Sequence, residues 1–227
     1  MIYPITRRTL FPVVRFFIKK TEGLENLPSS GPFIIACKHL GPLDGLFIAS
    51  VIIPYLGRKI SYVANIARWG WLWEKVVGEW WSNSIPFYKE NPKLCLAIAS
   101  EYLKQGKIVG IFPEGIIQDY LANKGENRIK TGVSRLALKS RVPIIPVGMV
   151  HDITVKKVQK LQRRRQVIKN FLLNPNSLEI HIGQPFELSA YYDREFTKEM
   201  LREASIYVMS KIDELTKVHY KNSNINT

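Results

Sequence analysis

A histidine and an aspartate stand five positions apart, with Gly41-Pro42 between them. On one continuous helix, His39 and Asp44 would point about 140° apart and would not meet. The Gly-Pro step instead indicates a turn, which would bring the imidazole back towards the carboxylate. An imidazole held by a carboxylate is a common general base near neutral pH. Taken alone, however, the stretch is explained more simply by a surface histidine beside an aspartate that caps a helix.

The composition limits the classes of protein to which this chain can belong. Its 227 residues suit one large domain, and 23% charged with 46% hydrophobic residues is typical of a folded protein. The net charge of +14 implies an anionic partner, which would be a nucleic acid, a phosphorylated substrate or an acidic lipid surface. Cys37 and Cys95 have no paired spacing, which favours a reducing setting in the cytosol.

Two basic segments are candidates for contact with a membrane surface. No stretch reaches the roughly eighteen apolar residues that span a bilayer, and no signal peptide is evident, so such contact is expected to be peripheral. Residues 5–20 separate into two sides on a helical projection: Leu10, Val13, Val14 and Phe17 against Arg7, Arg8, Arg15 and Lys19. This pattern is typical of an interfacial helix or of a helix packed on the protein body, and both can hold. Residues 153–178 contain no acidic residue, which indicates a solvated face or an anionic-surface contact.

Strands and helices alternate through most of the chain. Short apolar runs predict strands over 33–37, 60–64, 107–112, 144–150 and 178–182. Amphipathic periodicity predicts helices over 45–54, 93–105, 132–140 and 194–217. The tryptophans, all within 68–81, indicate a core, an acyl-chain groove or a membrane-interface patch. The alternation predicts an α/β fold: a single domain with a mixed, largely parallel sheet covered by helices, preceded by an N-terminal amphipathic helix.

The chemistry-bearing residues follow the predicted strands. His39 leaves the carboxyl end of the strand over 33–37, where open α/β sheets place their sites. Glu114 leaves another strand between Pro113 and Gly115, in a position to accept hydrogen bonds from a polyol or to hold a cation. Other chemistries lack their motifs, because there is no Gly-x-Ser-x-Gly elbow, no phosphate-cradling Gly-rich motif and no zinc spacing among the four histidines.

Four blocks then occur in an order and at separations that resemble the glycerolipid acyltransferases, the lysophosphatidic acid acyltransferase family. They are His39–Asp44, Phe112-Pro113-Glu114-Gly115, the basic Lys130-Thr131-Gly132 and the apolar Val142–Val147. The resemblance covers roughly residues 20–190, because Ile182-Gly183-Gln184-Pro185 is similar to the closing strand and turn of that family.

Three positions depart from the family pattern. Lys38 stands where the family usually has asparagine, and Phe87-Tyr88-Lys89 replaces an apolar-Asp-Arg ending. Ile116-Ile117-Gln118 replaces Thr-Arg-Ser. A lysine holds a phosphate as a point charge rather than as the two-pronged fork of an arginine, so these departures concern the phosphate of the acceptor.

The resemblance implies transfer of a fatty acyl group from an acyl thioester, acyl-CoA or acyl-ACP (acyl carrier protein), to the free hydroxyl of a lysoglycerolipid. The acceptor would be 1-acylglycerol-3-phosphate and the product phosphatidic acid, in phospholipid biosynthesis. It implies that His39 and Asp44 are catalytic, and that no metal or organic cofactor is needed. It also implies that five residues bind substrate: Lys89, Glu114, Gly115, Arg128 and Lys130.

The expected organisation is an N-terminal membrane-associating helix over 1–20 and an acyltransferase domain over 21–220, held at the cytoplasmic face of a membrane. Two alternatives remain at this point. One is the same chemistry on a different lyso-lipid acceptor. The other is a non-enzymatic basic protein that binds membranes or nucleic acid. Nucleic acid is not an expected partner, since aromatic residues do not interleave with the basic run.

Overall fold

The structure is a computed structural model that describes residues 3–41, 43–64, 84–88, 90–115, 129–151 and 173–223. Within these ranges, strands form one sheet in the order β1-β7-β6-β2-β5-β3-β4. The strands are β1 (Ile18–Glu22), β2 (Phe33–Cys37), β3 (Ile60–Ala64), β4 (Ile85–Pro86), β5 (Ile108–Ile111), β6 (Ile144–His151) and β7 (Leu178–Ile182). The α-helices are α1 (Tyr3–Arg15), α2 (Asp44–Leu56), α4 (Pro92–Lys104), α5 (Gly132–Ser140) and α7 (Lys198–Ser223). Short 3₁₀ turns lie at Leu24–Asn26 and Ser189–Tyr191.

The sheet is mixed and largely parallel. β6 and β7 pair antiparallel, and the other neighbouring strands pair parallel. β1 and β7 therefore run opposite to the other five strands. The predicted fold class is confirmed: an α/β sheet covered by helices, with an N-terminal helix before it.

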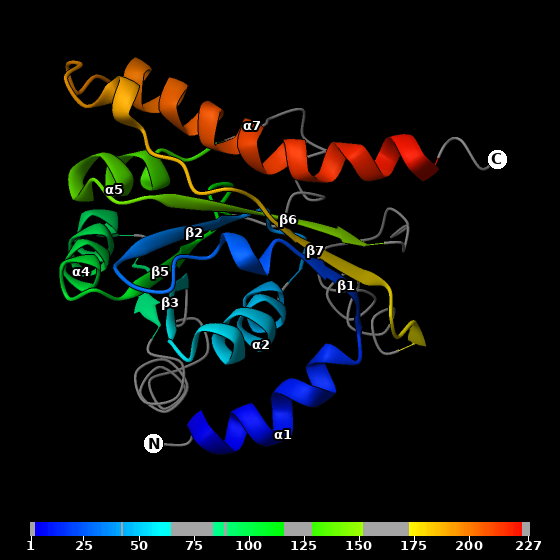
Figure 1. Ribbon diagram of the computed structural model, residues 1–227. Coiled ribbons are helices and arrows are strands. Elements are labelled where there is room, and N and C mark those ends of the chain that lie inside the picture. The colour runs from blue at the N-terminus through cyan, green and yellow to red at the C-terminus, as the bar shows by residue number, and fades with distance from the viewer. Residues whose placement is uncertain are drawn as a thin grey trace.

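Helices cover both faces of the sheet (Figure 1). α1 and α2 lie on one face, and α4, α5 and α7 lie on the other. Strand β2 shows why two layers are needed, because all five of its residues are buried. Phe33 and Ile35 pack towards α2, whereas Ile34 and Ala36 belong to the core on the opposite face. A central parallel strand that is buried on both faces is apolar throughout, as this one is.

Several predicted boundaries match the structure. The strands expected over 33–37, 60–64 and 178–182 and the helix expected over 132–140 have the observed bounds. Helix α4 ends before Gly106, whose φ of +75° lies in the left-handed region. That conformation suits glycine, which explains why a glycine marks this helix end.

The N-terminal segment differs from the prediction. The helix expected over 5–20 ends at Arg15, and β1 begins at Ile18 and pairs with β7. Lys19, predicted on the polar side of the helix, instead forms an ion pair with Glu179 of β7 at 3.0 Å. The strand is thus selected by partners about 160 residues away along the chain, which a local helical projection does not include.

Helix α7 begins later than predicted. Its first turn is capped by Thr197, whose Oγ1 accepts a hydrogen bond from Met200 N at 3.1 Å. Phe196, which lies inside the predicted helix range of 194–217, precedes the cap and is 55% exposed. Within the helix, Ala204, Val208 and Ile212 are buried, whereas Tyr207 is 39% exposed.

Other predictions lie outside the described residues. These include all five tryptophans, the core of the acid-free segment over 152–172, and the departure over 116–118. Among the residues that are described, no helix is both long enough and apolar enough to cross a membrane.

Candidate active site

The turn after β2 brings His39 and Asp44 together. His39 Nδ1 lies 2.7 Å from Asp44 Oδ2, at hydrogen-bond distance. Asp44 is the first residue of α2, and its side chain does not cap that helix, because the N-cap position is Leu43. Instead, its Oδ2 also accepts hydrogen bonds from the backbone N–H groups of Leu40 at 2.7 Å and Gly41 at 2.8 Å. The contact between His39 and Asp44 that the Gly-Pro step predicts is therefore present. The Asp44 carboxylate also stabilises the turn, through its hydrogen bonds to the backbone of Leu40 and Gly41.

Asp44 is buried, with a relative exposure of 1%. Burial raises the pKa of its carboxyl above the ordinary value, and hydrogen bonds from His39, Gly41 and Leu40 oppose that rise. Oδ2 carries every hydrogen bond made by this carboxylate, whereas Oδ1 is buried and has no hydrogen-bond partner in the structure as described. One carboxylate oxygen therefore fixes the imidazole, and the other is unsatisfied.

The imidazole ring of His39 is held on a second side by an aromatic ring. Phe112 stacks on it with 4.4 Å between ring centroids and 27° between planes. The His39 side chain stays 22% exposed. Because Nδ1 faces the carboxylate, Nε2 is the nitrogen left to exchange a proton with a substrate.

Glu114 lies beside this pair but makes a different contact from the one predicted. Its Oε2 accepts a hydrogen bond from the backbone N–H of His39 at 3.1 Å. The residue is 3% exposed, and its Oε1 has no hydrogen-bond partner within the described part of the chain. Glu114 therefore ties the end of β5 to the end of β2, and one oxygen remains for a further donor.

Burial raises the pKa of the Glu114 carboxyl to about 7. The His39 backbone N–H and the charges of Lys38 and His39 limit the rise, and the charge of Asp213 adds to it. The native protein thus keeps a proton on Glu114 at pH values where the unfolded chain has lost it.

This proton predicts a pH-dependent stability. The unfolding free energy should fall as pH rises from 4.5 to about 7, by at most about 3 kcal/mol, since a glutamate titrates near 4.5 when unfolded. In Glu114→Gln this part of the slope should vanish, because the amide does not ionise. Denaturant unfolding of both proteins at pH 5 and pH 8 measures the difference. An equal pH slope in the two proteins would contradict the assignment.

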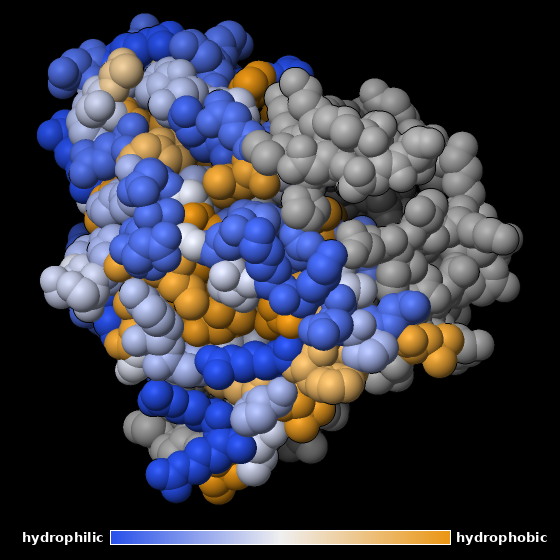
Figure 2. All heavy atoms as spheres, turned by 45° about the vertical axis from the view of Figure 1, so that its right-hand side comes forward, coloured by the Kyte–Doolittle hydropathy of each residue, from blue (hydrophilic) through white to orange (hydrophobic). Residues whose placement is uncertain are grey.

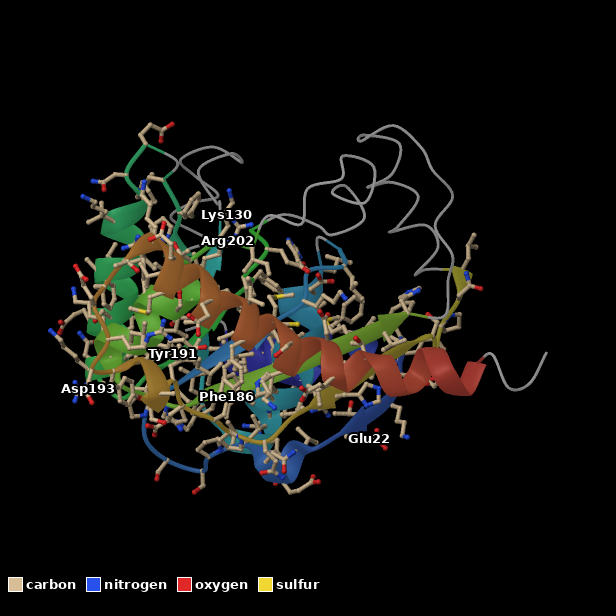
Figure 3. The ribbon with its side chains drawn as sticks, turned by 90° about the horizontal axis from the view of Figure 1, so that it is seen from above. Glu22, Lys130, Phe186, Tyr191, Asp193 and Arg202 are labelled. Carbon is tan, nitrogen blue, oxygen red and sulfur yellow. The ribbon has the colours of Figure 1, made fainter. Side chains whose placement is uncertain are left out.

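Gly115 and Lys130 complete the turn after β5. Gly115 N donates to Phe112 O at 3.0 Å, and its φ of +66° explains the glycine. Lys130 N donates to Pro113 O at 2.9 Å, and its exposed side chain passes Gly115. In the view from above, Lys130 lies on the opposite side of the molecule from Glu22, the last residue of β1 (Figure 3). The turn thus places one flexible cation at the edge of the sheet that carries His39.

The remaining sequence-predicted cations, Lys89 and Arg128, lie outside the described residues. One cation was not predicted as part of the site. Lys38 Nζ is 3.1 Å from Asp213 Oδ1 of α7, so this lysine ties the end of β2 to the helix above it. The sequence contained one indication that Lys38 is special, because it stands where the family usually has asparagine.

Comparisons with known proteins agree with this arrangement of blocks. A family model described as Acyltransferase matches residues 19–150, which is more than half of the chain. The 1-acyl-sn-glycerol-3-phosphate acyltransferase of Bacillus subtilis (strain 168) is 28% identical over 152 residues, covering 66% of this chain and 71% of the relative. The chloroplastic 1-acyl-sn-glycerol-3-phosphate acyltransferase BAT2 of Brassica napus is 29% identical over 146 residues, or 60% of this chain and 38% of the relative.

A solved structure is also similar. It is the 1-acyl-sn-glycerophosphate (LPA) acyltransferase PlsC from Thermotoga maritima, with a TM-score of 0.48 and 18% identity over 94% of this chain and 83% of that one. The family match includes the turns that carry His39, Asp44 and Glu114. The chain therefore belongs to the acyltransferase family.

Proposed function

We propose that this protein is an O-acyltransferase that moves a fatty acyl group from an acyl thioester to the free hydroxyl of 1-acylglycerol-3-phosphate. The observation that carries the proposal is the 2.7 Å contact between His39 and Asp44 at the end of β2, in a chain of the acyltransferase family. The two relatives described above, which are 1-acyl-sn-glycerol-3-phosphate acyltransferases, support this acceptor. The product would be phosphatidic acid, and the pathway phospholipid biosynthesis.

The reaction uses His39 as a general base. Its Nε2 takes the proton of the acceptor hydroxyl as that oxygen attacks the thioester carbonyl carbon. Asp44 stabilises the resulting imidazolium and keeps Nδ1 protonated. Collapse of the tetrahedral intermediate breaks the carbon–sulfur bond, and the leaving thiolate takes the proton back from the imidazolium. The products are the ester and the free thiol, and this sequence needs no metal or organic cofactor.

Substrate contacts follow from the groups that remain unsatisfied around this pair. Glu114 Oε1 is buried beside His39 and suits a hydroxyl of the glycerol backbone as donor. Gly115 leaves room over the turn, and Lys130 extends from it as a partner for the acceptor's phosphate. Lys89 and Arg128 are the other proposed phosphate partners. Because lysine is a weaker determinant of phosphate geometry than arginine, another lyso-lipid acceptor is the second candidate.

An acyl-transfer assay tests the proposal. Purified protein should be supplied with acyl-CoA or acyl-ACP and with a panel of acceptors that includes 1-acylglycerol-3-phosphate, lysophosphatidylcholine and monoacylglycerol. We expect 1-acylglycerol-3-phosphate, the acceptor with a phosphate monoester, to be preferred with one of the two donors. Preference for another lyso-lipid would keep the chemistry and change the acceptor, whereas no transfer to any acceptor would refute the proposal.

We propose further that α1 contacts the cytoplasmic face of a membrane as a peripheral element. The helix has two apolar faces, and only one is used inside the protein. Phe11 and Val14 are buried in the core shared with α2, whereas Val13 is 60% exposed. Phe16, in the turn that follows the helix, is 66% exposed. Ile5 is 62% exposed and falls about 80° from Val13 on a helical projection. At the bottom of Figure 2, where α1 lies, strongly hydrophilic and hydrophobic groups are exposed side by side.

Because α1 packs on α2, some of its basic residues are not available to contact a membrane. Arg7 and Arg15, expected on the solvent side, donate to backbone carbonyls of Pro54 at 3.1 Å and Ser50 at 2.7 Å in α2. Residues 18–20 belong to β1, so the proposed boundary at residue 20 falls within a strand of the sheet. Substitution on the outward face is therefore a cleaner test than deletion of the segment.

Val13→Glu/Phe16→Glu should bind anionic vesicles at least about tenfold more weakly, because two exposed apolar side chains lose their transfer out of water. Co-sedimentation with acidic and neutral vesicles at two salt concentrations measures this. Phe196→Glu/Ile206→Glu, which changes exposed apolar residues near and on α7, is the matched control. An equal loss in the control would exclude α1 as the contact, and equal binding to both vesicle types would exclude the electrostatic contribution.

A further inference from the structure

Tyr62 of β3 lies in a slot formed by two glycines. Its partner across the parallel pair is Gly110 of β5, and its ring lies over that residue. A Cβ atom on Gly110 would collide with Cδ1 and Cε1 of the ring. On the other edge, Cδ2 and Cε2 lie 3.7 Å from the position of a Cβ atom on Gly45, the residue after Asp44. The absence of side chains at both positions lets the ring cross β5 towards the end of β2.

The hydroxyl of Tyr62 is buried and has no hydrogen-bond partner in the described structure. A buried hydroxyl without a partner costs roughly 1–3 kcal/mol, and phenylalanine would fill the same slot without that cost. Packing alone therefore does not account for a tyrosine here.

A second unsatisfied atom belongs to the catalytic carboxylate. Asp44 Oδ1 is buried and without a hydrogen-bond partner among the described residues, whereas Oδ2 receives all the hydrogen bonds. Burial raises the pKa of Tyr62 well above its usual value, and the charges of Cys37 and Asp44 raise it further. The titratable groups that face the hydroxyl are thus Cys37 from β2 and Asp44 from α2. The hydroxyl therefore stays protonated and is available as a donor, and the charge of Asp44 acts on it.

The ring of Tyr62 is also linked to the imidazole. It stacks with Phe112 at a centroid distance of 6.1 Å and an interplanar angle of 17°. Phe112 in turn stacks on His39 at 4.4 Å. The three rings form a stack that ends at the proposed base. A shift of the Tyr62 ring would therefore change the orientation of the imidazole plane.

We propose that Tyr62 is a positioning residue for the His39–Asp44 pair: one internal water joins its hydroxyl to Asp44 Oδ1, while its ring supports Phe112 against the imidazole. The hydrogen bond fixes the rotation of the carboxylate, so that Oδ2 faces Nδ1 of His39. It also stabilises the charged form of a carboxylate that burial disfavours. This inference rests on the proposed function and adds a residue from a third strand to it.

Tyr62→Phe removes the hydroxyl and keeps the ring. We expect kcat to fall about ten- to a hundredfold, the effect of losing a hydrogen bond to a charged group, with KM for donor and acceptor unchanged. The acid limb of the kcat–pH profile should move to higher pH, because a carboxylate without this donor makes the pair more basic. Thermal stability should change little, because the phenylalanine ring keeps the packing of the slot.

Two further variants test this interpretation, one with an expected loss of kcat and one as a control. Phe112→Leu keeps apolar bulk and removes the stacking, so it should also lower kcat. Tyr192→Phe is the matched control, because it removes a hydroxyl that bonds Glu187 at 3.0 Å on the exposed surface. It should leave kcat and the pH profile unchanged. A Tyr62→Phe protein with normal kcat and an unmoved acid limb, or with only a lower Tm, overturns the proposal.

A measurement without substrate separates this inference from the proposed function. Titration of the His39 imidazole by NMR, with its signal assigned by its loss in His39→Gln, should show a higher apparent pKa in Tyr62→Phe than in the unaltered protein. If wild-type protein transfers no acyl group but this shift is present, the function fails and the positioning role stands. If the enzyme is active and His39 titrates identically in both proteins, the positioning role is refuted.

Discussion

Replacing His39 with alanine should lower acyl transfer on the order of 10²- to 10⁴-fold, the usual contribution of a positioned general base. The fold should survive, because the contact that joins the end of β2 to Glu114 uses the backbone N–H of His39 and not its side chain. Turnover with 1-acylglycerol-3-phosphate and a saturating donor measures the loss, and circular dichroism checks the fold.

A matched histidine controls for the substitution. His151 is the last residue of β6 and is only partly buried. His151→Ala should retain nearly full turnover. A His39→Ala protein that turns over at a near-normal rate would rule out the base mechanism, whatever the control does.

Asp44→Asn should cost a similar factor in kcat, about 10²–10⁴. The amide oxygen can still accept the hydrogen bonds made to Oδ2, but it carries no charge to stabilise the imidazolium that forms when the hydroxyl proton is taken. Folding should be retained, because a neutral amide escapes the desolvation that raises the pKa of this buried carboxyl.

The control for this carboxylate is Asp213→Asn. Asp213 pairs with Lys38, the residue before His39, and its side chain is 36% exposed. We expect only a few-fold change in kcat, from the disturbed tie between α7 and β2. If the two asparagine variants lose activity equally, the effect belongs to the general electrostatics of the region and not to the pair.

Prediction from sequence succeeded where the information was local. The bounds of β3, α5 and β7 follow from apolar runs that are interrupted by glycine, proline or polar residues. The meeting of His39 with Asp44 also followed from one local feature, the turn between them. In each case the deciding contacts lie within a few positions along the chain.

The features that were predicted wrongly or missed depend on contacts between distant parts of the chain. β1 was mistaken for helix because its lysines suit a helical polar face, whereas Lys19 and Glu22 in fact contact Glu179 and His181 of β7. The outward direction of Val13 depended on the placement of α2. Tyr62 was missed because it crosses a neighbouring strand. The glycine at 110, inside a strand, was the available signal, since such glycines often mark a close approach by another group.

The pairing of β1 has a consequence for the order in which the fold is completed. Among the described residues, β1 is an edge strand and β7 is its one partner, so Ile18 cannot pair until Leu178 has been synthesised. At ribosomal speed the intervening chain of about 160 residues takes roughly ten to thirty seconds to synthesise. During that interval the backbone of β1 has no strand to pair with, and Lys19 and Lys20 are the charges that discourage pairing with a neighbouring nascent chain. The strand that follows the N-terminal helix is therefore fixed in the sheet only after β7 has been synthesised.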